Sequence, residues 1–104
     1  MESNNVSEQL SSYRQTIDNI DAALVNMLAE RFRCTDNVGI LKAEHALPAA
    51  DKDREKQQLF RLKILATEAG LDQVLVQEIM QFIIDKVVQR HIEIARQHQA
   101  KSIR

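Results

Sequence analysis

Apolar positions recur at steps of three and four residues along the first part of the chain. The series runs over about residues 7–44 and consists of Leu10, Tyr13, Ile17, Ile20, Leu24, Met27, Arg31, Cys34, Val38 and Leu41, with arginine as its one charged member. Such spacing places side chains on one face of an α-helix, and its persistence over four heptads is typical of helices that pair along a seam. We predict one long helix over 7–44, with Asn5 or Ser7 as its N-cap.

Two shorter helices follow from the same periodicity. The first is predicted over 51–68 and the second over 72–97, with Asp51 and Asp72 as N-caps. The apolar stripe of the 51–68 helix is Leu59, Leu62, Leu65 and Ala66, and the inward positions expected for the 72–97 helix include Leu75, Ile79, Phe82, Ile83 and Val87. We expect the helix to fray after His98, at the end of the chain.

The few glycine and proline residues divide the chain. There are two glycines and one proline in 104 residues, with four aromatic side chains, which argues against the many turns of a sheet fold. Pro48 breaks the first helix and Gly70 ends the second in a left-handed conformation. Gly39 lies inside the long helix, where glycine is unfavourable, and it predicts the close approach of a neighbouring helix or ligand beside the candidate site, with a tolerated interior glycine as the alternative. We predict a single all-α domain of three helices over residues 1–104.

The length of the first helix predicts a second copy of the chain. About 38 residues at ~1.5 Å each extend over roughly 57 Å, whereas a compact domain of this size has a radius of gyration of about 13 Å. Two shorter helices are too small to cover such a seam. We therefore predict a homodimeric helical bundle in which the long helices are intertwined.

Charge and cysteine content exclude several classes of function. The formal net charge is −1, which disfavours non-specific nucleic-acid binding, and the single cysteine excludes an intrachain disulfide or a cysteine-based zinc site. The polar N-terminal residues lack the apolar core of a signal peptide, and no apolar run is long enough for a membrane span. We expect a cytoplasmic protein without a membrane or nucleic-acid partner.

Three basic residues lie on or beside the apolar seam. Arg31 is a seam position, and Lys42 lies eleven residues later on the same helix face. A small anion is able to meet both side chains, but Arg14 lies about 25 Å from Arg31 along a straight helix. An antiparallel partner helix would bring Arg14 to the same site. The spacing also allows a buried arginine paired with a carboxylate, and solvated side chains at Lys42 and Arg14.

The start of the 51–68 helix carries a second group of polar residues. Asp51, Arg54 and Glu55 cluster within its first turn, where they either face the same cavity or form a solvated helix surface. From the residues alone, the hypothesis is therefore a dimeric bundle with an internal anion site.

In combination, these residues resemble the all-helical class of chorismate mutases. The resemblance rests on Arg14 in YRQTIDNID, Arg31 in LAERF, Lys42 in VGILKA and the group Asp51-x-x-Arg54-Glu55. It extends from about Leu10 to Ala95 and implies a dimer of three-helix subunits. Each of its two sites would take most residues from one subunit and the arginine matching Arg14 from the other.

The resemblance also implies the reaction. Chorismate mutases convert chorismate to prephenate by a unimolecular Claisen rearrangement that needs no metal or cofactor, as part of aromatic amino acid biosynthesis. Arg14 and Arg31 would hold the carboxylates, and Lys42 would bind near the ether oxygen. Arg54 would support the electrostatics, and Glu55 with the Asp51 region would hold the ring hydroxyl.

The 72–97 helix departs from the pattern of this family. Family members often carry a serine there and, four residues later, a glutamine or glutamate that hydrogen-bonds the ether oxygen. The matching positions here are Val87, which donates nothing, and His91, whose ring N–H is able to replace the glutamine. A solvent-facing histidine near a helix end is the alternative.

Two other functions remain open from the sequence. An isochorismate pyruvate-lyase shares this fold and its basic residues, although Asp51 and Glu55 favour the mutase. A non-catalytic dimerisation module would explain the seam but gives no reason for Arg31 and Lys42 to share its inward face.

Overall fold

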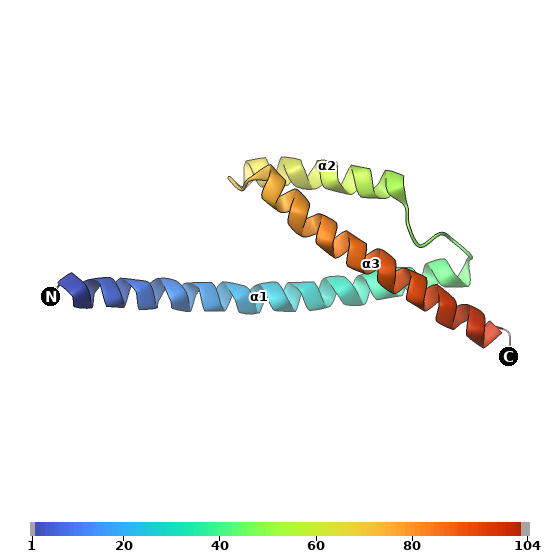
Figure 1. The fold of residues 1–104 in the computed structure, drawn as a ribbon, viewed down its shortest axis with the longest axis horizontal. Coiled ribbons are helices and arrows are strands. Elements are labelled where there is room, and N and C mark those ends of the chain that lie inside the picture. Colours follow the sequence, from blue (N-terminus) through green and yellow to red (C-terminus); the bar gives the residue numbers. More distant parts are fainter. Residues whose placement is uncertain (1, 103–104) are drawn as a thin grey trace. The chain divides into compact units, whose positions relative to one another are not determined.

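The chain folds into three α-helices in the part that the structure describes, residues 2–102. The computed structural model has α1 over Glu2–Glu44, α2 over Lys52–Glu68 and α3 over Gln73–Ser102, and these described residues contain no strand (Figure 1). The predicted all-α class is therefore confirmed. None of the described helices is long and apolar enough to cross a membrane.

Two of the predicted helix ends were wrong. The first helix begins at Glu2 rather than at residue 7, so Asn5 and Ser7 lie inside it, and Gln9 Nε2 donates to Asn5 Oδ1 at 3.4 Å. The third helix continues to Ser102 rather than 97, with Ser102 Oγ donating to the His98 carbonyl at 2.8 Å. Neither segment contains a glycine or proline that would stop the helix, so helix formation continues outward.

Both predicted breaks are present, and both use the same hydrogen-bond pattern. At the end of α1, Ala46 has a positive φ of 54°, and the Leu47 N–H donates to the Lys42 carbonyl at 2.8 Å. At the end of α2, Gly70 has a φ of 72°, and the Leu71 N–H donates to the Ala66 carbonyl at 2.8 Å. Each is a Schellman motif, in which a left-handed residue lets the chain turn back and satisfy the last helical carbonyls.

The two predicted aspartate caps are confirmed. Asp51 Oδ1 accepts from the Arg54 N–H at 3.1 Å, and Asp72 Oδ2 accepts from the Leu75 N–H at 2.9 Å. Each carboxylate satisfies a backbone donor that the first helical turn leaves open. The caps therefore fix where α2 and α3 begin.

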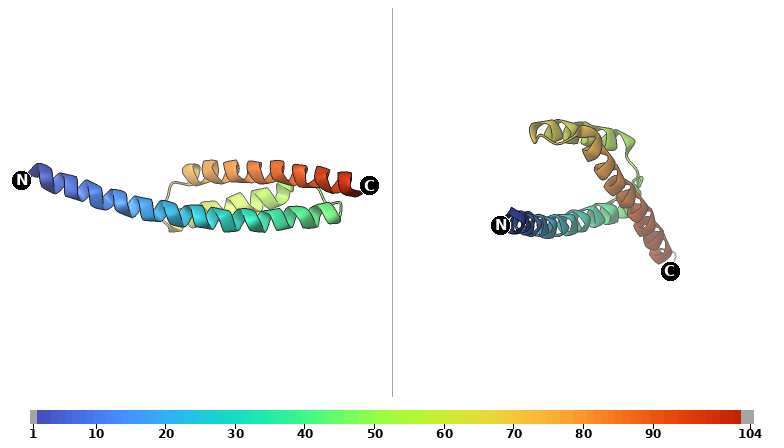
Figure 2. Two further views of the ribbon diagram at one scale, coloured as in Figure 1. Left: turned by 90° about the horizontal axis from the view of Figure 1, so that it is seen from below. Right: turned by 60° about the vertical axis from the view of Figure 1, so that its left-hand side comes forward.

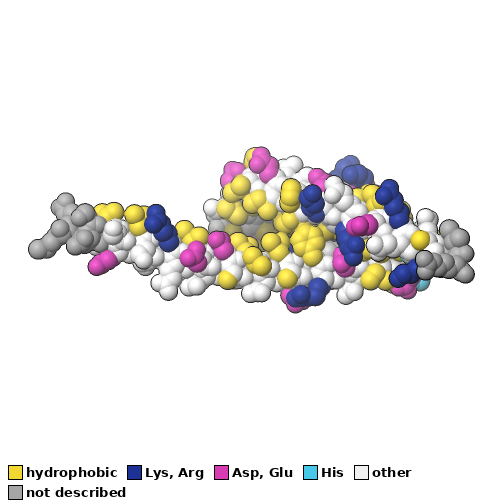
Figure 3. All heavy atoms as spheres, turned by 60° about the horizontal axis from the view of Figure 1, so that its bottom comes forward, with side chains coloured by type: hydrophobic (Ala, Val, Ile, Leu, Met, Phe, Trp, Pro, Cys, Tyr) yellow, Lys and Arg dark blue, Asp and Glu magenta, His cyan; other side chains and the backbone are white. Residues whose placement is uncertain are grey.

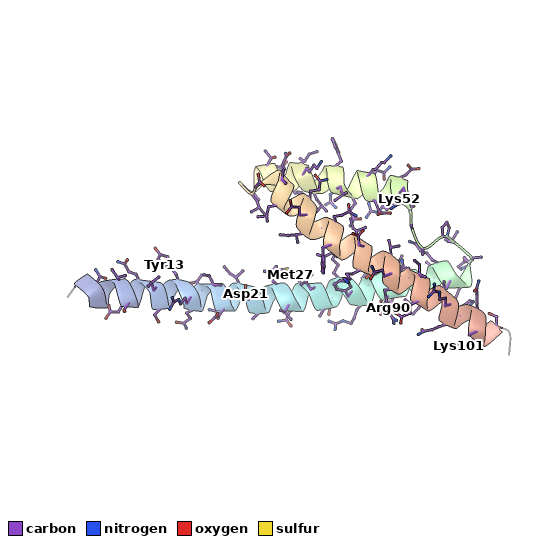
Figure 4. The ribbon with its side chains drawn as sticks, in the orientation of Figure 1. Tyr13, Asp21, Met27, Lys52, Arg90 and Lys101 are labelled. Atoms are coloured by element: carbon purple, nitrogen blue, oxygen red, sulfur yellow. The ribbon has the colours of Figure 1, made fainter. Side chains whose placement is uncertain are left out.

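The chain divides into two compact units, with the boundary after Cys34 inside α1. The first unit, described over residues 2–34, is a single helical segment whose seam side chains lie open, as Figure 3 shows for its hydrophobic residues. Tyr13 and Met27 project from it with 68% and 61% of their surface exposed (Figure 4). This segment has no core of its own.

The second unit, described over residues 35–102, packs α3 against α2 and against the last turns of α1 (Figure 2). Its buried apolar side chains are Ala66, Ile83, Ile84 and Ile94. Of the inward positions predicted for α3, only Ile83 is among these buried side chains. Leu75, Ile79 and Phe82 are 45–64% exposed within this chain. The helix is apolar on more than one face, and the core takes the face that contains Ile83 and Ile94.

Candidate functional site

A pocket lies where the chain passes from α1 to α2. Its volume is about 330 Å³, and it is lined by Lys42, Leu47, Pro48, Ala50, Asp51, Lys52 and Asp53. The Schellman turn at Ala46 and the following proline fold the chain back over the end of α1, which brings the start of α2 near Lys42. Lys52, at the first residue of α2, marks this end of the helix in Figure 4.

Lys42 lines this pocket and makes one hydrogen bond there. Its side chain is half-buried, and Nζ donates to the Ala49 carbonyl at 3.2 Å. One carbonyl uses only one of the three donors of the ammonium group. The remaining donors and the positive charge are available to an anion in the pocket.

The acidic residues at the start of α2 take two different positions. Asp51 lines the pocket, but one of its carboxylate oxygens caps the helix. The Glu55 side chain is only 13% exposed, with Oε1 3.7 Å from Lys52 Nζ and with Oε2 buried and unpartnered. Arg54 is exposed on the helix surface. Glu55 is therefore not the solvated side chain that the alternative interpretation expected.

His91 is buried between α3 and the last turns of α1. Its exposed fraction is 4%, and Nε2 lies 2.7 Å from the Thr35 carbonyl oxygen. Gly39 makes this contact possible, because a Cβ there would lie 2.6 Å from His91 Cδ2 and 2.9 Å from Ile94 Cδ1. The close approach predicted at Gly39 is confirmed, and the neighbour is a helix. Val87, one turn before His91, is half-buried.

An ion-pair cluster next to His91 was missed by sequence reasoning. Arg90 Nε lies 3.3 Å from Asp36 Oδ1, and Arg90 Nη1 lies 3.3 Å from Glu93 Oε2 (Figure 4 labels Arg90). The hydrogen bond and charge of Asp36, and then Glu93, raise the pKa of Arg90 above its ordinary value. Asp36 and Arg90 are 54 positions apart, and no local pattern in the sequence connects them.

The two other predicted arginines belong to the first unit. Arg14 is exposed on α1, whereas Arg31 is half-buried and its Nη1 is buried without a hydrogen-bond partner. The structure thus brings Lys42 and Asp51 together at one pocket and places Glu55 one turn further along α2. It describes Arg14 and Arg31 only within their own helical segment.

Three of the predicted residues share an unusual feature. Among the described side chains, residues 5–102, the buried polar atoms without a hydrogen-bond partner are Arg31 Nη1, Glu55 Oε2 and His91 Nδ1. Buried polar groups in folded proteins are nearly always hydrogen-bonded, so each exception calls for an explanation. Within the same residues, no group of three or more metal-ligating side chains could hold a metal ion.

Comparisons with known proteins point to one family. The family model described as chorismate mutase type II matches residues 13–92. The chain is 31% identical over 78 residues to the chorismate mutase of Methanocaldococcus jannaschii, covering 75% of this chain and 79% of that protein.

Other relatives are much longer than this chain. It is 30% identical over 73 residues to the T-protein of Haemophilus influenzae and 33% identical over 79 residues to the bifunctional chorismate mutase/prephenate dehydratase of Buchnera aphidicola subsp. Schizaphis graminum. These matches cover 70% and 76% of this chain but only 19% and 20% of the relatives' lengths. The chain thus spans about one fifth of each of these two proteins.

Proposed function

The chain belongs to the chorismate mutase type II family, and we propose that it converts chorismate to prephenate in aromatic amino acid biosynthesis. We propose further that residues 1–104 act as one catalytic domain of a homodimer in the cytoplasm. The family match over residues 13–92 and the likeness to a chorismate mutase of similar length support this function.

The observation that carries the proposal is the set of unpartnered buried polar atoms. Nη1 of Arg31, Oε2 of Glu55 and Nδ1 of His91 belong to three residues that the family resemblance assigns to the substrate. A buried polar atom without a partner costs free energy, and a substrate with two carboxylates, a hydroxyl and an ether oxygen supplies partners of the required kinds. A purely structural dimerisation module gives no reason for this coincidence.

The chemistry requires shape and charge rather than a nucleophile. The rearrangement breaks the ether C–O bond as a C–C bond forms, and electron pairs move only within the substrate. Arg14 and Arg31 would hold the carboxylates in the compact reactive conformer, and Glu55 with the Asp51 region would accept the ring hydroxyl. Lys42 would stabilise the negative charge that grows on the ether oxygen, and Arg54 would add to the positive potential there. Even a 10⁶-fold acceleration requires about 8 kcal/mol from such positioning and electrostatics.

The homodimer is supported by the exposed seam of α1. Within a single chain, four aliphatic seam residues are 45–54% exposed: Leu10, Ile17, Ile20 and Leu24. Tyr13, on the same seam, is 68% exposed. A continuous apolar stripe of this kind marks an interaction surface, and a long isolated helix gains most of its stability from packing. An antiparallel second copy would cover the stripe and bring its Arg14 to the site.

The direct test compares prephenate formation by the wild type and by Lys42→Met. Removing one preorganised donor at a developing oxyanion typically costs about 10²–10³-fold in rate, so we expect a loss of at least 100-fold. Lys56→Met is the matched control, because Lys56 is an exposed lysine on α2, and its rate should stay within about twofold of wild type.

Isochorismate is assayed beside chorismate with the same protein. Pyruvate release from isochorismate without prephenate formation would replace the mutase with the lyase. No turnover of either compound by a folded dimer would favour the non-catalytic module.

A further inference from the structure

The hydrogen bond of His91 fixes which ring nitrogen carries a proton. Nε2 lies 2.7 Å from the Thr35 carbonyl oxygen, and a carbonyl oxygen only accepts hydrogen bonds. Nε2 is therefore the protonated nitrogen. A neutral imidazole has a single N–H, so Nδ1 of the neutral ring is a bare acceptor.

The packing around Gly39 keeps the ring in this orientation. A Cβ at position 39 would lie 2.6 Å from Cδ2 and 3.1 Å from Nε2 of His91, so one edge of the ring lies directly on the α1 backbone. The ring is only 4% exposed, and the opposite nitrogen, Nδ1, is buried without any partner. Neutral His91 thus has no N–H to offer to a substrate oxygen.

A proton on Nδ1 would supply such an N–H, but this protonation is favourable only when a ligand is present. In the empty protein the imidazolium would bury an N–H and a positive charge without an acceptor, which is unfavourable. A dianionic substrate supplies both an acceptor oxygen and compensating negative charge. Binding of the substrate and binding of the proton therefore favour each other.

We propose that His91 takes up one proton at Nδ1 when the dianionic substrate binds, and that the imidazolium is the form that donates to the ether oxygen. This inference rests on the proposed mutase function. The proton comes from solvent as the substrate binds and stays on Nδ1 while the substrate rearranges. It returns to solvent when the product leaves, so no proton is gained or lost over one turnover.

Other charged groups of the second unit have partners of their own. Arg90 is paired with two carboxylates, Lys42 donates to a backbone carbonyl, and Glu55 lies beside a lysine. The titratable and charged groups of the pocket, of the proposed substrate site and of the ion-pair cluster are Arg31, Asp36 and Lys42 on α1, Asp51, Lys52, Asp53, Arg54 and Glu55 at the start of α2, and Arg90 and Glu93 on α3. Replacing His91 alone leaves all of these in place, which separates its titration from theirs.

The first experiment measures kcat/KM for chorismate between pH 6 and 9 with wild type and His91→Gln. Glutamine keeps a hydrogen-bond donor but does not titrate. Because one proton is required, the wild-type value should fall towards tenfold per pH unit at the alkaline end, while His91→Gln should change by less than about threefold. The same alkaline fall in both proteins would overturn the inference.

The second experiment reads the ring directly in the wild-type protein, so it does not depend on a variant that folds. Nitrogen NMR of labelled histidine is recorded with and without prephenate as the probe, and His45→Gln and His98→Gln assign the three rings. We expect one protonated nitrogen in free His91 and two in the prephenate complex. A ring that keeps a single N–H in the complex would contradict proton uptake. Failure to convert chorismate at any pH would instead contradict the proposed function itself.

Discussion

The N-terminal segment and the remainder of the chain use apolar residues in opposite ways. In residues 5–34 the seam side chains from Leu10 to Met27 are 45–68% exposed, and the segment is one helix without a core. In residues 35–102, Ile84 and Ile94 are 4% and 7% exposed, and three helices supply the packing. The second unit thus has a core of its own, whereas the first leaves its apolar seam exposed within a single chain.

This contrast indicates which part of the chain the proposed second copy would cover. Long helices in water gain most of their stability from packing an apolar face, and a single chain leaves the seam face of residues 5–34 open. The pocket at Lys42, the half-buried Glu55 and the His91 contact, in comparison, lie entirely in the second unit. In the proposed dimer, the partner would cover the seam of α1 and supply Arg14 to these residues.

The largest effect is expected from a charge placed in the seam. Leu24→Asp would bury a carboxylate in the proposed dimer interface at two symmetric positions, at a cost of several kcal/mol per group. We expect the dimer to dissociate at micromolar concentration and the activity to fall about 100-fold or more. Light scattering and the chorismate assay measure both effects.

Ala22→Asp is the matched control for this substitution. It introduces the same side chain two residues away, on the opposite face of α1, where Ala22 is exposed. We expect a stable, active dimer. Equal loss in both variants would show that the seam is not the interface.

The second expected effect is on the packing of α3 against α1. Gly39→Ala places a methyl group against His91 and Ile94, and such overpacking costs about 1–3 kcal/mol, against roughly 1 kcal/mol gained in helix propensity. We expect a net loss of up to about 2 kcal/mol in the free energy of unfolding. Urea denaturation measures it.

A double-mutant cycle with His91→Ala isolates the cause of that loss. Removing the ring creates room for the methyl group, so Gly39→Ala in the His91→Ala background should be neutral or stabilising. An unchanged loss in that background would mean that the strain comes from another neighbour.

Smaller changes in stability are expected from substitutions at the two Schellman turns. Ala46→Gly should stabilise the protein by about 1 kcal/mol, because a left-handed conformation strains alanine. Gly70→Ala should destabilise it by about the same amount, although nothing lies within 4 Å of the added Cβ. Urea denaturation measures the free energy of unfolding of both variants. Changes of the same sign would show that backbone conformation does not govern these two helix ends.

What the sequence predicts well is local. Pro48 and Gly70 mark the two breaks, and Asp51 and Asp72 the two caps, because each acts through its own backbone or that of near neighbours. The ends at Glu2 and Ser102 carry no such signal, and both were placed too far inward. Gly39 correctly indicated a close neighbour.

What the sequence does not predict depends on how the helices turn toward one another. α3 has apolar residues on two faces, and only its packing selects Ile84 and Ile94 over Leu75 and Phe82 for the core. The same rotation brings Arg90 to Asp36 and His91 to the Thr35 carbonyl. The resemblance identified His91 as a candidate, but which nitrogen is protonated emerged only from the contact.

In the proposed dimer, each site takes Arg14 from one chain and its other residues from the second chain. Arg14→Ala and Arg31→Ala chains, each expected to be inactive alone, are mixed and allowed to exchange subunits. A mixed dimer then holds one intact site and one doubly altered site, so random pairing should restore about one quarter of wild-type chorismate mutase activity. No recovery, with mixed dimers demonstrated by native mass spectrometry, would contradict a shared site.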